Sequence, residues 1–64
     1  MNIFVKISND VGTQLKAAEI IGVSTSAYSD WVLGYKKPSA KNTKKIAKLF
    51  NIPREQIRPD IYGD

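Results

Sequence analysis

Four small polar side chains lie close together in the stretch GVSTSAYSDWVLG, which runs from Gly22 to Gly34. Hydroxyls donate and accept hydrogen bonds, and a carboxylate accepts them. If the stretch is a helix, all four fall on one side, with Leu33 further along, and Trp31 falls on the opposite side with Tyr28. The four are Thr25, Ser26, Ser29 and Asp30. Their spacing predicts either a surface that binds a partner by hydrogen bonding or a plainly solvated helix side.

The composition argues against catalysis. The chain of 64 residues contains no histidine and no cysteine, so the commonest general base, metal ligand and nucleophile are missing. The six acidic residues are scattered and form no obvious pair. We therefore expect no catalytic residue, metal site, cofactor or small-molecule substrate, and the composition favours a binding function.

Positive charge is concentrated in one part of the chain. The net charge is +4, and the segment from Lys36 to Lys48 carries six lysines and no acid. These lysines are residues 36, 37, 41, 44, 45 and 48. Such a cluster is typical of a domain that binds a phosphate-bearing partner, although a lysine-rich helix can also be merely solvated.

Glycine, serine and proline divide the chain into about five short helices, and strand signals are poor. We predict an all-α fold in a single domain over residues 1–64. The first helix is expected at about Asn2 to Asp10, and a last short turn is expected to begin at Pro53. The expected N-caps of the second, third and fourth helices are Thr13, Ser24 and Ser39. The expected stops are Gly12, Gly22, Gly34 and Asn51.

The second and third helices are separated only by Gly22, Val23 and Ser24. Two short helices joined by so tight a turn are typical of a helix-turn-helix, here over about residues 13–34, whose second helix lies in the major groove of DNA. Ala18 is small enough to let the two helices cross closely. Hydroxyl side chains on the second helix would then face base edges, while Asp30 could either accept from a cytosine amino group or pair with a lysine.

The chain resembles the Cro/repressor family of phage and bacterial helix-turn-helix regulators over about residues 12 to 57. The resemblance rests on Gln14, Ala18, Gly22 to Ser24, Trp31 and the segment GYKKPSAKNTKKIAKLFNIP. It implies a compact domain of five helices that binds a two-fold DNA operator as a homodimer, in the cytoplasm of a bacterial host and associated with its nucleoid. It places Thr25, Ser26, Ser29 and Asp30 at base-reading positions. Phosphate contacts are implied for Gln14, Lys36, Lys37, Lys41 and Lys44.

Two features depart from the family pattern. Tyr28 stands where a smaller aliphatic residue is usual, so it could complete the core, as we favour, or reach the DNA. The outer side of the third helix also lacks Arg, Asn and Gln, which make bidentate base contacts. Specificity would then depend partly on DNA shape or on bridging water.

The ending IRPDIY resembles that of short prophage-type Cro-like proteins. Candidates for a dimer surface are Ile52, Ile57, Ile61 and Tyr62, with completion of the core as the other role for Ile52 and Ile57. The sequence contains no separate oligomerisation domain, so we expect either a short Cro-like repressor or an isolated DNA-binding domain.

An antitoxin, or another regulator whose main partner is a protein, is the alternative function. A toxin-like neighbouring gene would favour the antitoxin, and a divergently transcribed repressor gene would favour the Cro-like repressor. Binding of single-stranded RNA is disfavoured because the aromatic residues look buried. No signal peptide and no membrane span are expected, since the N-terminus MNIFVKISND lacks the features of a leader and no apolar run is long enough.

Overall fold

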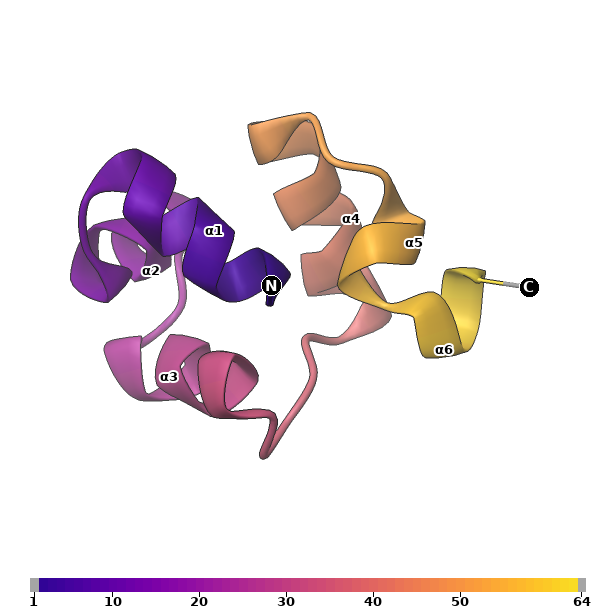
Figure 1. The fold of residues 1–64 in the computed structure, drawn as a ribbon, viewed down its shortest axis with the longest axis horizontal. Coiled ribbons are helices and arrows are strands. Elements are labelled where there is room, and N and C mark those ends of the chain that lie inside the picture. The colour runs from indigo at the N-terminus through magenta and orange to yellow at the C-terminus, as the bar shows by residue number, and fades with distance from the viewer. Residues whose placement is uncertain (1, 64) are drawn as a thin grey trace.

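The computed structural model describes residues 2–63, and these residues form six helices and no strand (Figure 1). The helices are α1 (Ile3–Val11), α2 (Gln14–Ile21), α3 (Thr25–Leu33), α4 (Ala40–Phe50), α5 (Arg54–Ile57) and α6 (Pro59–Tyr62). The predicted all-α fold is therefore confirmed.

The predicted N-caps hold the helices at their starts. The hydroxyls of Thr13, Ser24 and Ser39 accept hydrogen bonds from backbone amides at 3.0, 3.1 and 3.2 Å, which satisfies donors that have no partner within the helix. The first helix begins one residue later than expected, because Asn2 acts as its N-cap and accepts from the amide of Phe4 at 2.8 Å.

The stops of α2, α3 and α4 are also as predicted. Gly22 and Gly34 are left-handed, with φ of 89° and 81°. Asn51 is left-handed as well, with φ 54° and ψ 50°, and it is the one non-glycine residue with positive φ in the described part of the chain. Asparagine tolerates this conformation better than most residues, because its short polar side chain can bond locally.

Three aromatic rings form the centre of the core. Phe4 of α1 meets Tyr28 of α3 edge to face, with 6.1 Å between ring centroids, and Trp31 lies 5.7 Å from Phe4 and 5.9 Å from Tyr28. Tyr28 is 0% exposed and Trp31 is 6% exposed. The hydroxyl of Tyr28 donates to the backbone carbonyl of Phe4, and burial raises the pKa of this phenol, so it stays protonated as a donor. Tyr28 is thus a core residue and not a DNA-facing one.

The additional helix, α6, occupies the tail in which the sequence showed no periodicity. Its four residues are too few for a hydrophobic repeat to be recognised. Pro59 stands at its first turn, where a fixed φ suits a helix and a missing N–H costs nothing.

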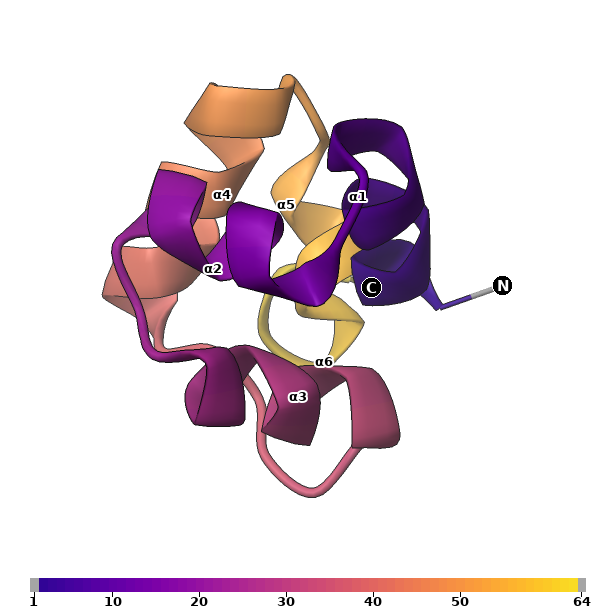
Figure 2. The same cartoon turned by 90° about the vertical axis from the view of Figure 1, so that its left-hand side faces the viewer.

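Helix α3 and the C-terminal end of α4 lie at opposite ends of the molecule. Figures 1 and 2 show α3 and the loop that follows it at one end, and the C-terminal end of α4 at the opposite end. No helix in residues 2–63 combines the length and the apolar character that crossing a membrane requires.

Candidate nucleic-acid interface

The connection between α2 and α3 is a tight turn. The amides of Gly22 and Val23 both donate to the carbonyl of Ala18, at 2.8 and 3.0 Å, and Ser24 then caps α3. Ala17 and Ala18 are 0% and 1% exposed. Small buried side chains here let the two helices pack closely, and Val23 packs against the core from the turn.

The outer side of α3 is small and polar, as the sequence predicted. Thr25 and Ser26 are exposed on its first turn, and Ser29 and Asp30 are partly exposed one turn later. Leu33 extends the same side and is 60% exposed. The hydroxyl groups are therefore free to meet a partner while the aromatic side of the helix is held in the core.

Asp30 contacts the loop that follows α3. Its carboxylate lies 3.9 Å from the ammonium of Lys36, and its backbone carbonyl accepts from the amides of Tyr35 and Lys36 at 2.9 and 3.4 Å. In the free chain Asp30 thus takes the lysine-pairing role that the sequence left open. The contact also brings Lys36 to the same end of the molecule as the α3 hydroxyls.

The other polar residues expected at the interface come from three segments. Gln14 is the first residue of α2 and is partly exposed, Lys37 is exposed in the α3–α4 loop, and Lys41 and Lys44 are exposed on α4. The sequence offers no reason to place Lys45 at the interface. Its ammonium nevertheless lies close to the turn, 3.1 Å from the position that a Cβ atom on Gly22 would occupy.

The comparisons with known proteins decide the family. The sequence model described as helix-turn-helix matches residues 12–57. This range includes α2, α3, the turn between them, the α3–α4 loop and α4. The chain belongs to the helix-turn-helix family. Members of this family are DNA-binding transcription regulators. A search of curated proteins and a search of solved structures gave no match.

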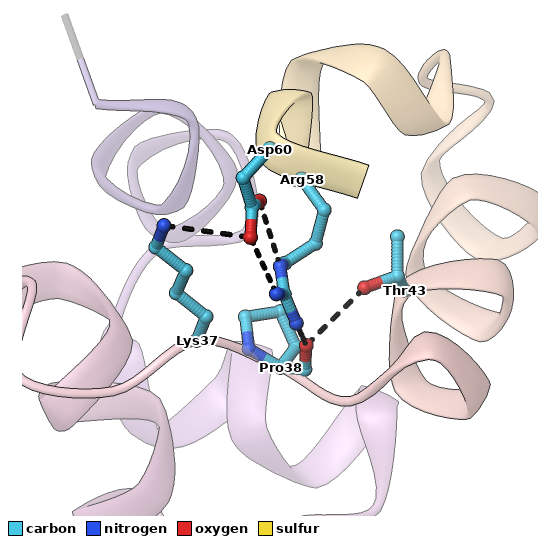
Figure 3. Close-up of polar contacts among 5 residues, drawn as sticks. All are labelled: Lys37, Pro38, Thr43, Arg58 and Asp60. Carbon is cyan, nitrogen blue, oxygen red and sulfur yellow. Dashed lines mark hydrogen bonds and ion pairs between the residues drawn. The ribbon is translucent and has the colours of Figure 1, made fainter. Parts of the chain in front are cut away.

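A polar cluster that the sequence did not predict joins the α3–α4 loop to Arg58 and Asp60, which lie just beyond the helix-turn-helix match (Figure 3). The guanidinium of Arg58 donates to both carboxylate oxygens of Asp60, at 3.0 and 2.6 Å, and to the backbone carbonyl of Pro38 at 2.6 Å. The ammonium of Lys37 lies 3.6 Å from the same carboxylate. The only available signal was the Arg-Pro-Asp spacing, which does not reveal a contact with a loop 20 residues away.

The candidate dimer residues have different environments. Ile57 is 5% exposed and belongs to the core, so its expected place on a dimer surface is corrected to the core role that the sequence left open. Ile52 also packs against the core. Ile61 is 49% exposed, and the partly exposed ring of Tyr62 lies under the guanidinium of Arg54, 5.0 Å from its centroid.

Acid should weaken the fold through Asp60. The hydrogen bonds from Arg58 hold the pKa of Asp60 well below its usual range. Because the pKa is lower in the folded than in the unfolded chain, the pair stabilises the fold above a pH of about 4, and this stabilisation is lost as the pH falls further. From neutral to acid pH, the free energy of unfolding measured in urea should fall less for Asp60→Asn than for the natural chain. Arg58→Met, which removes the cause, should behave like Asp60→Asn, and equal losses in all three chains would contradict the prediction.

Proposed function

We propose that this chain is a sequence-specific regulator that binds double-stranded DNA as a single domain in the cytoplasm. In this proposal α3 enters the major groove and reads bases with Thr25, Ser26, Ser29 and Asp30. The observation that carries it is the two-sided character of α3, with Tyr28 and Trp31 buried and the hydroxyl side exposed. Short side chains let the helix backbone come near the base edges.

The flanking DNA backbone is assigned to Gln14 and to the exposed lysines of the loop and α4. Backbone contacts fix the position of a protein on the duplex and carry no sequence information. Gln14 suits this role because it is the first residue of α2, where the backbone amides carry a partial positive charge that attracts phosphate. The lysines are Lys36, Lys37, Lys41 and Lys44.

We further propose that the protein is a Cro-like repressor of phage type that binds a two-fold operator as a homodimer. The exposed Ile61, with Tyr62 beside it, supplies apolar surface for the contact between copies. A repressor is favoured over an activator because a domain seated on its operator blocks access of the polymerase. Footprinting on the DNA upstream of its own gene would identify the operator and show whether the protected site has two-fold symmetry.

Two sets of variants should separate backbone binding from base reading. Lys36→Ala/Lys37→Ala is expected to weaken binding to operator and random duplexes alike and to reduce the slope of log K against log salt by about two, or roughly one for each phosphate contact. Ser26→Ala should instead reduce the ratio of operator to random affinity. Fluorescence anisotropy over a salt series measures both quantities.

Lys48→Ala is the control for charge, since Lys48 is exposed in the last turn of α4, at the end of the molecule opposite α3. It should change the salt slope less than loss of Lys36 alone. The assigned surface would be wrong if neither the lysine pair nor Ser26 affected DNA binding.

A further inference from the structure

The C-terminal end of the chain contacts the loop that we assign to the DNA backbone. Lys37 and Pro38 of this loop meet Asp60 and Arg58, as Figure 3 shows. The helix-turn-helix match ends at residue 57, so the two C-terminal partners are not part of the region that assigns the family. Membership of the family therefore does not explain the contacts of Arg58 and Asp60 with the loop.

Arg58 is well placed to hold the loop. Its side chain is only 16% exposed, and it donates two hydrogen bonds to Asp60 and one to the carbonyl of the buried Pro38. The hydroxyl of Thr43 approaches the same carbonyl at 3.5 Å. A guanidinium bound in this forked manner has a fixed orientation, so the position of Pro38 is fixed relative to α6.

The carboxylate of Asp60 contacts two cations, Arg58 closely and Lys37 loosely. Its bonds to Arg58 are short and lie in a bidentate arrangement, whereas the ammonium of Lys37 is 3.6 Å away and its side chain is 62% exposed. Exposed ion pairs of this kind are weak, so a DNA phosphate can replace the carboxylate at Lys37. Until it does, the carboxylate occupies the lysine and repels the phosphate.

We propose that Arg58 positions the α3–α4 loop and that Asp60 competes with DNA phosphate for Lys37, which lowers the affinity for every DNA sequence. This inference rests on the proposed function, because it requires Lys37 to bind the DNA backbone. The pair then sets how strongly the domain holds nonspecific DNA, without contacting a base.

The competition is tested with a random duplex by fluorescence anisotropy at several salt concentrations. Asp60→Asn should tighten binding by about two- to five-fold, the range expected for release of an exposed ion pair, and should steepen the salt slope. Glu55→Gln removes the same charge from an exposed position on α5 and should have a smaller effect. Asp60→Glu, which keeps the charge, should bind more weakly than Asp60→Asn.

A double-mutant cycle locates the effect. In a chain that already carries Lys37→Ala, adding Asp60→Asn should change the affinity no more than Glu55→Gln does. The competition is disproved if Asp60→Asn gives the same gain with and without Lys37, or no more than Glu55→Gln gives in the natural chain. If Lys37→Ala leaves the affinity unchanged both in the natural chain and in the Asp60→Asn chain, Lys37 makes no phosphate contact, and the competition fails together with that part of the proposed function. If Lys37→Ala weakens binding but Asp60→Asn gives no gain, the competition alone fails.

Arg58 is tested as a positioning residue. Arg58→Met should weaken binding to operator and random DNA by the same factor, since the loop loses its anchor and the carboxylate of Asp60, no longer bound by Arg58, is left to Lys37. Arg58→Lys should restore part of the affinity through one hydrogen bond to Pro38. Affinities equal to that of the natural chain in Arg58→Met, with the fold intact by circular dichroism, would overturn this role.

Discussion

Tyr28→Ala should remove most of the stability of the fold. Tyr28 is 0% exposed and packs against both Phe4 and Trp31, and truncation of a buried aromatic side chain costs about 3–5 kcal/mol. A domain of this size has a free energy of unfolding of roughly 3–10 kcal/mol, from about 0.05–0.15 kcal/mol per residue. The melting temperature followed by circular dichroism should therefore fall by at least about 12 °C.

Two variants separate the contributions to this loss. Tyr28→Phe keeps the ring and removes only the hydrogen bond to the carbonyl of Phe4, so it should cost about 1 kcal/mol. Leu33→Ala truncates a side chain of the same helix that is 60% exposed, and it should change the stability by less than about 0.5 kcal/mol. A melting temperature for Tyr28→Ala close to that of Leu33→Ala would refute the central place given to Tyr28.

Local signals in the sequence determine the parts of this fold that could be predicted. A capping hydroxyl and a left-handed stop act within a few residues, so Ser24, Gly34 and Asn51 mark helix ends without reference to the rest of the chain. The inward side of α3 follows from the spacing of Tyr28 and Trp31 in the same way. The hydroxyl side, which lies opposite, could be predicted for the same reason.

Contacts between distant segments could not be predicted. Arg58 reaches Pro38 across 20 residues, and nothing near either residue signals the other. The burial of Ile57 depends likewise on how α5 returns to the core, which its four residues do not determine. Tyr28 had two possible roles because a tyrosine has both an apolar ring and a polar tip. The carbonyl of Phe4 decides between them by accepting its hydroxyl inside the core.

Ser26→Glu should abolish DNA binding while leaving the fold at least as stable. Ser26 is exposed in the first turn of α3, two residues after the N-cap Ser24. A carboxylate there interacts favourably with the partial positive charge of the helix N-terminus, by about 0.3–1 kcal/mol. In the proposed complex the same carboxylate faces the groove between two phosphate chains, where like charge costs several kcal/mol. We expect affinity to fall by roughly 100-fold or more for operator and random DNA, since each 1.4 kcal/mol is about a factor of ten.

The opposite signs of the two effects make this variant more informative than a simple loss of binding. Ser26→Gln has the same length without the charge, so it measures the steric part of the loss. Gln56→Glu adds the same charge at an exposed position on α5 and measures the effect of net charge alone. If Ser26→Glu melted at or above the natural temperature and still bound DNA as well as Gln56→Glu, α3 would not be the helix that enters the groove. Because the fold is retained, such a result could not be attributed to unfolding.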